Sequence, residues 1–250
     1  MRSAAVPGFR PSVHGFRFAN RWPPGPTVRL GPLDPRLLGI GDASAGLCGG
    51  MVATVRDLFE AGIAPPVDPE PPANGSPRFR AIVRRQVQSL AWGRVPLRYW
   101  DLQAFRPDPP MGLAALLGRE PARVVAVERE WPRVRAAIEA GVLPIVGLIR
   151  VAGWSPRRLV VNHQVLAHAF EEDEAGFRVH VYDPNHPGRD DVELRAVIAP
   201  ADGRPPRARI SLAQSTGEPL LGFFRQPDPP PPSSLAAWRS RPTADPTIAP

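Results

Sequence analysis

The chain has 250 residues, a hydrophobic fraction of 43% and a formal net charge of +7, and this length is enough for one domain with a full hydrophobic core. One cysteine excludes an internal disulfide framework and any zinc site built from several cysteines. The positive charge comes from arginine alone and is spread from Arg2 to Arg241 instead of forming one stripe, so we expect no nucleic-acid partner.

The N-terminus, MRSAAVPGFRPSVHG, lacks the apolar run of a secretory signal. No segment of the sequence reaches the roughly eighteen consecutive apolar residues of a membrane span. We therefore expect a cytoplasmic protein without a membrane-spanning segment.

The two ends of the chain differ from its middle in composition. Residues 1–35 are rich in Pro, Gly and Arg, and they predict an arm that docks on the core through Phe9, Phe16, Phe18 and Trp22. Residues 226–250 contain a run of prolines and little to bury, so we expect a disordered tail there. One domain is predicted between these ends, over residues 36–225.

Apolar residues recur at helical spacing in the first half of this domain. The pattern predicts helices over residues 51–62, 78–92 and 132–140. The second half changes to short segments rich in β-formers, separated by turn residues. These predict strands over residues 142–151, 159–170, 177–184, 192–199, 208–213 and 219–225. We therefore predict an α+β fold in which an N-terminal helical half packs on a C-terminal antiparallel β-sheet.

The single cysteine, Cys48, lies in the segment SAGLCGGM, directly before the first predicted helix. A helix N-terminus presents unpaired backbone N–H groups and the positive end of the helix dipole, and both favour a thiolate. The neighbouring Gly46, Gly49 and Gly50 let the backbone turn sharply and let a substrate approach. A structural role for the cysteine is the alternative.

A histidine and an aspartate accompany the cysteine in the second half. Alternation along the segment LVVNHQVLAHAF places His163 on one strand face with Val161 and Val165, where a satisfied core histidine is the plain alternative. Antiparallel pairing through the EEDEAG connection brings Asp183 close to His163, and a carboxylate there would fix the histidine tautomer. Asn185 is the alternative orienting residue, and a DPN turn that only ends the strand is the alternative to a site.

The motifs GLCGGM, NHQVLAHAF and VYDPNHPG together resemble the papain-like cysteine peptidases, and most closely the bacterial branch that includes the double-glycine leader peptidases. The resemblance implies a papain-like fold with Cys48 as nucleophile, His163 as general base and acid, and Asp183 as orienting residue. It implies a hydrolase, either a peptidase or an amidase, that acts on a peptide or protein through a thioester. No cofactor is expected.

The sequence departs from that family at one position. Papain-like enzymes usually carry a glutamine about six residues before the cysteine, where its amide donates to the oxyanion, and this chain has Asp42 there. The backbone N–H of Cys48, helped by Ser44 or Asn162, is a possible substitute. Two alternatives to hydrolysis stay open at this point: a papain-like module that binds peptides without turnover, and a cysteine acyltransferase.

A metal site would have to be assembled from His163, His168, His180 and His186. His163 and His168 are five residues apart on one predicted strand, so they face opposite sides unless a bulge intervenes, and we predict no metal site. The oligomeric state is not predicted.

Overall fold

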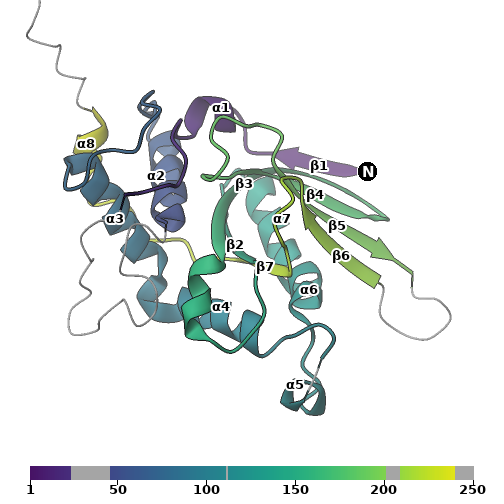
Figure 1. The fold of residues 1–250 in the computed structure, drawn as a ribbon. Coiled ribbons are helices and arrows are strands. Elements are labelled where there is room, and N and C mark those ends of the chain that lie inside the picture. The colour runs from purple at the N-terminus through teal and green to yellow at the C-terminus, as the bar shows by residue number, and fades with distance from the viewer. Residues whose placement is uncertain (24–45, 111, 201–208, 240–250) are drawn as a thin grey trace, which may run out of the picture.

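The structure is a computed structural model, and it describes residues 1–23, 46–110, 112–200 and 209–239. Within these ranges, strands form one antiparallel sheet in the order β6-β5-β4-β3-β2-β7, with β1 paired to the far half of β3 (Figure 1). The strands are β1 (Arg2–Ala5), β2 (Ile145–Ile149), β3 (His163–Asp173), β4 (Gly176–Tyr182), β5 (Glu193–Ala199), β6 (Arg209–Gln214) and β7 (Gly222–Arg225). The predicted combination of helices and an antiparallel sheet is confirmed.

Helices lie beside and behind this sheet. In Figure 1, α2 stands next to β3, α3 lies on the other side of α2, and α8 lies beside α3, while α7 lies behind the strands and α5 projects at the bottom. The α-helices are α1 (Pro11–His14), α2 (Cys48–Glu60), α3 (Pro77–Ser89), α4 (Arg94–Ala104), α5 (Leu113–Leu116), α6 (Ala122–Val125), α7 (Trp131–Glu139) and α8 (Ala236–Arg239). The other helical segments are the 3-10 helices η3 (Ala91–Gly93) and η5 (Pro156–Val161) and the π-helix η4 (Ala126–Glu130). No helix in the described ranges is long and apolar enough to cross a membrane.

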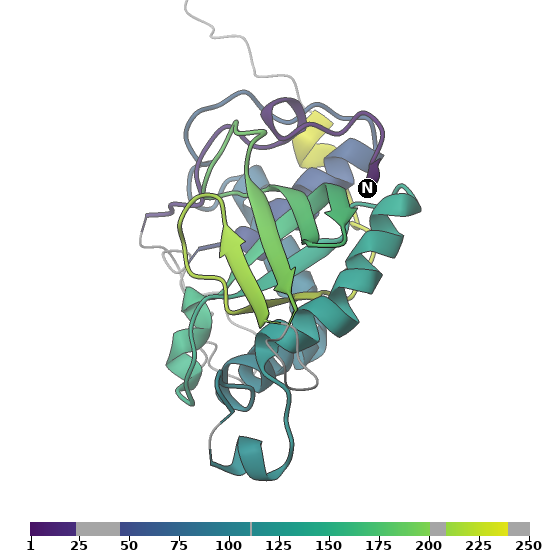
Figure 2. The same ribbon diagram turned by 90° about the vertical axis from the view of Figure 1, so that its right-hand side faces the viewer.

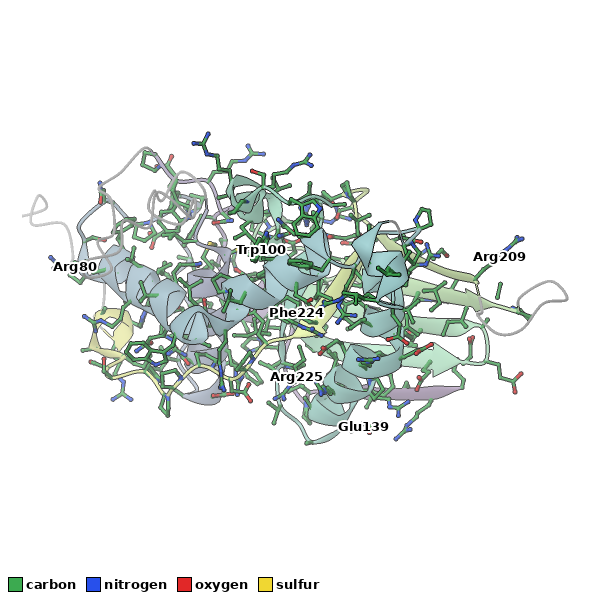
Figure 3. The ribbon with its side chains drawn as sticks, turned by 90° about the horizontal axis from the view of Figure 1, so that it is seen from below. Arg80, Trp100, Glu139, Arg209, Phe224 and Arg225 are labelled. Atoms are coloured by element: carbon green, nitrogen blue, oxygen red, sulfur yellow. The ribbon has the colours of Figure 1, made fainter. Side chains whose placement is uncertain are left out.

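Helix α7 covers one face of the sheet, as the view turned by 90° shows (Figure 2). Trp131 at its start stacks on Phe177 of β4 with ring centroids 4.1 Å apart, and it meets Phe170 of β3 edge to face. Figure 3 shows Glu139, at the other end of α7, beside β1, where its carboxylate pairs with Arg2. The helix is therefore fixed to the sheet at both ends.

Helix α2 is buried on nearly every side, between α3 and β3. Two of its glycines make this possible. A Cβ at Gly50 would lie 2.3 Å from the carbonyl oxygen of Ile82 in α3, and a Cβ at Gly49 would lie 2.5 Å from the side-chain oxygen of Gln164 in β3. The GLCGGM motif therefore serves close packing on both sides of the helix that begins at Cys48.

The predicted helices and strands appear with shifted ends and with additions. The helices predicted at 51–62, 78–92 and 132–140 are α2, α3 and α7, whereas α4 was not predicted. The strand predicted from residue 159 begins only at His163, because η5 extends to Val161 and leaves that side chain half-exposed. The prediction that Val161 shares a strand face with His163 is therefore wrong.

The N-terminal arm packs on the core over its described residues, 1–23. All four aromatic residues expected to dock are buried, and Phe16 and Phe18 stack with centroids 4.8 Å apart. The arm also contributes β1, which composition did not predict, since RSAA is a weak strand former that is held by its pairing with β3.

The C-terminal segment differs from the prediction of a disordered tail over residues 226–239. Figure 3 shows the chain leaving β7 at Arg225 and running along the helical layer to α8. Trp238 is 7% exposed, with its ring 5.4 Å from that of Phe16. The low content of apolar residues misled the prediction, because a single buried tryptophan and hydrogen bonds from arginines hold the segment.

Candidate active site

Cys48 is the first residue of α2, so its neighbours determine which backbone N–H groups remain available. Asn20 of the N-terminal arm accepts a hydrogen bond from the N–H of Leu47 at 2.7 Å, and Gln86 of α3 accepts one from the N–H of Gly50 at 2.7 Å. For the N–H groups of Cys48 and Gly49, the described part of the chain supplies no partner. These two donors lie at the positive end of the helix dipole and are free to bind a developing negative charge.

His163 is the first residue of β3 and is 4% exposed. Its Nε2 lies 2.7 Å from Oδ1 of Asp183, and Cys48 is near enough to contribute to raising the pKa of His163. Because Nε2 faces the carboxylate, Nδ1 is the nitrogen left for the sulfur. The hydroxyl of Tyr99 in α4 donates to the backbone oxygen of His163 at 2.6 Å and fixes the strand start.

Asp183 directly follows β4 and is completely buried. Its Oδ1 accepts from the backbone N–H of Asn185 at 2.8 Å as well as from His163, and its Oδ2 accepts from Nε2 of Gln214 at 2.8 Å. A guanidinium nitrogen of Arg150 lies 3.8 Å from Oδ2 and donates to Gln214. A buried carboxylate with this many donors stays ionised and points in one direction.

The electrostatics of the pair follow from these contacts. Burial of the ring lowers the pKa of His163, but the charge and hydrogen bond of Asp183, together with the contact to Cys48, outweigh burial and raise the pKa to about 9. Burial raises the pKa of Asp183, but His163, the N–H of Asn185 and the charge of Arg150 lower it to about 2. At neutral pH the pair is therefore an imidazolium and a carboxylate.

His163 and Asp183 are in direct contact, and Cys48 is near enough to help raise the pKa of His163. Asn185 is close by, but its backbone N–H orients Asp183, and its side chain does not face the imidazole. Asn162 accepts from the N–H of Arg150 at 3.0 Å and donates to Gln103 at 2.8 Å, so its amide fastens the start of β3. Asp42 and Ser44, the other predicted oxyanion residues, lie outside the described residues.

Several supporting residues were missed from the sequence. Asn20 joins the two motifs directly: it accepts from Leu47 and donates to the side-chain oxygen of Asn185 at 3.3 Å. Arg150 and Gln214 come from β-sheet segments far from each other in the chain. Single asparagines, glutamines and arginines give no pattern in a sequence, so only the fold identifies these three.

The remaining histidines lie elsewhere. His168 occupies a register irregularity between Ala167 and Ala169, and its ring packs 5.4 Å from Phe9 and 6.2 Å from His180. His186 pairs with Glu218 at 2.7 Å. A bulge could have brought His168 to the same side as His163. The bulge is present, but it turns His168 toward the N-terminal arm and not toward His163.

A small cleft opens beside Cys48, between the α3–α4 junction and η5. The residues lining it are uncharged: Gly46, Cys48, Gln86, Leu90, Val95, Pro96, Tyr99, Leu159, Val160, Asn162 and Gln164. Gln164 is unusual among them. It is 4% exposed, and no group in the described part of the chain donates to its side-chain oxygen.

Comparison of the chain with models of protein families, with curated proteins and with solved structures found no match.

Proposed function

We propose that this protein is a papain-like cysteine hydrolase, a peptidase or an amidase, with Cys48 as nucleophile, His163 as general base and acid, and Asp183 as orienting residue. The observation that carries the proposal is the buried contact of 2.7 Å between His163 Nε2 and Asp183 Oδ1, and its support is that Cys48 is near enough to help raise the pKa of this histidine. Nucleophile, base and orienting carboxylate in this order are the arrangement that activates a thiol for acyl transfer.

The steps follow from the positions of the groups. The Cys48 thiolate, paired with the His163 imidazolium, attacks the acyl carbonyl, while the N–H groups of Cys48 and Gly49 stabilise the oxyanion. The imidazolium gives its proton to the leaving nitrogen as the carbon–nitrogen bond breaks, which leaves a thioester. Water then attacks the thioester and gives a proton to Nδ1, and the carbon–sulfur bond breaks to release the acid.

Alkylation of the single cysteine tests the proposal without a known substrate. An ordinary thiol is only about 0.3% ionised at pH 6, so a thiolate paired with His163 should react with iodoacetamide about a hundredfold faster than such a thiol. We expect fast, stoichiometric labelling of the native chain at pH 6, measured by mass spectrometry, and slow labelling of His163→Ala.

His186→Ala is the matched control, because His186 is paired with Glu218 and is not part of the proposed triad. Its labelling rate should equal that of the native chain. Equal rates in the native chain and in His163→Ala would eliminate the hydrolase proposal. Hydrolysis of an internally quenched peptide library, abolished in Cys48→Ala, would then separate turnover from binding alone.

A further inference from the structure

The cleft beside Cys48 is lined by apolar residues and by side-chain amides. The apolar residues are Leu90, Val95, Pro96, Leu159 and Val160. The amides are those of Gln86, Asn162 and Gln164. Apart from Cys48, no lining residue is charged, so a charged group that entered would lose water without gaining a counter-charge from these residues.

Of the three amides, only that of Gln164 has a buried oxygen without a partner. Gln86 accepts from Gly50, and Asn162 is held by Arg150 and Gln103. No group in the described residues donates to the side-chain oxygen of Gln164. This side chain is more than nine-tenths buried, so it has little compensation from water.

The position of Gln164 is fixed by the motif that carries the cysteine. Its side-chain oxygen lies against Gly49. A Cβ added at Gly49 would be 2.5 Å from this oxygen and 2.5 Å from the hydroxyl oxygen of Ser89. Ser89 donates to the backbone oxygen of Gln86, so its hydrogen is not available to Gln164. Rotation about the last side-chain torsion, which is broad for glutamine, can present either end of the amide to the cleft.

We propose that Gln164 determines substrate specificity: the cleft takes the side-chain carboxamide of a glutamine or asparagine residue in the acyl part of a peptide substrate. This inference rests on the proposed function. A primary carboxamide carries both an N–H donor and a C=O acceptor, so it can pair with whichever end of the Gln164 amide faces the cleft. An apolar side chain leaves the buried amide unpaired.

Blocked tripeptide chloromethyl ketones test the inference. They should differ only at the first or the second residue from the reactive carbon, with glutamine, norleucine, glutamate or lysine at that place. We expect the glutamine reagent to inactivate the labelling-competent native protein at least about tenfold faster than the norleucine reagent of similar size. Glutamate and lysine reagents should be slower still.

Gln164→Leu should abolish that preference or reverse it toward norleucine, and Gln164→Glu should favour lysine. Gln88→Leu is the matched control, because Gln88 lies on α3 outside the cleft and accepts from Arg85, and it should keep the native preference. A native protein that prefers norleucine, or a preference for glutamine that survives in Gln164→Leu, would overturn the inference.

The failure of this inference can be told from a failure of the proposed function. Iodoacetamide labelling that does not depend on His163 removes the function itself. Labelling that depends on His163, combined with reagent rates that do not depend on Gln164, removes only the specificity role.

Discussion

At the residue scale, the orientation of His163 is determined by the groups that hold Asp183 and by the group that holds the backbone of His163. Asp183 is held by Asn185 and Gln214, and the backbone of His163 is held by Tyr99. Gln226 extends this support, since its amide donates to the Tyr99 hydroxyl at 3.3 Å. A histidine that is fixed by its backbone and by its Nε2 can offer Nδ1 to the sulfur in only one direction.

The pKa of His163 makes a prediction about stability. Its ordinary pKa is 6.5 and its pKa in the fold is about 9, so the folded chain binds this proton more tightly. The resulting stabilisation is fully present below pH 6.5 and is lost as pH rises through 9. In Asp183→Asn the pKa of His163 should fall. Between pH 6.5 and 9 the free energy of unfolding should therefore decrease less in this variant than in the native chain, by on the order of 1 to 3 kcal/mol.

Urea unfolding of the native chain and of Asp183→Asn at pH 6.5, 7.5 and 9 measures this difference. Asp191→Asn is the control, because Asp191 is exposed and pairs with Arg189 on the surface. A native chain whose stability does not decline relative to Asp183→Asn over this range would show that the pair does not hold the proton as the contacts indicate.

At the element scale, α2 connects the chemistry to the packing. Its first residue is the proposed nucleophile, and its next two residues are glycines that let β3 and α3 approach. Gly50 leaves less room than Gly49, because its nearest neighbour is the backbone carbonyl oxygen of Ile82, whereas Gly49 lies against side chains. The same motif therefore positions the thiol and sets the distance between two layers.

Gly50→Ala tests this interpretation. Alanine in an unobstructed helix interior stabilises a protein by about 1 kcal/mol relative to glycine. Here the added methyl group meets backbone at 2.3 Å, so we expect a net loss of about 1–3 kcal/mol in the free energy of unfolding. Chemical denaturation followed by circular dichroism measures it. A variant as stable as the native chain would mean that α2 and α3 separate easily.

The elements that could be predicted are those whose pattern is local. Helix α2 and strand β4 show clear periodicity, whereas α4 carries Pro96 in its first turn and follows Ala91 and Trp92, which both have a positive φ. The triad could be proposed because its members lie in three distinctive motifs. Gln164 could not, because its role depends on a buried amide without a partner, and the sequence does not show hydrogen bonds.

At the scale of the whole molecule, residues 226–239 fasten the helical layer from outside. Arg85 of α3 pairs with Asp57 of α2 and donates to the backbone oxygen of Pro230 at 2.7 Å. Burial raises the pKa of Asp57 to about 6, although the charge of Arg85 opposes that rise. The segment thus adds a hydrogen bond to a buried ion pair and offsets part of its loss of water.

Trp238 ends this segment and tests how much it contributes. Its ring packs between Phe16 of the N-terminal arm and the guanidinium of Arg78, 5.9 Å from its centroid, so one side chain joins both ends of the chain to α3. We expect Trp238→Ala to lower the free energy of unfolding by about 2–4 kcal/mol, somewhat less than full removal of a core tryptophan, because the terminal segment can shift to fill part of the space.

Trp92→Ala is the matched control, because Trp92 is fully exposed and should change the stability by no more than about 0.5 kcal/mol. Urea unfolding gives both values, and iodoacetamide labelling at pH 6 should keep its native rate in Trp238→Ala, since the tryptophan lies outside the cleft beside Cys48. Equal stability of the two variants would show that residues 226–239 only rest on the helices, and that the helical layer holds together without them.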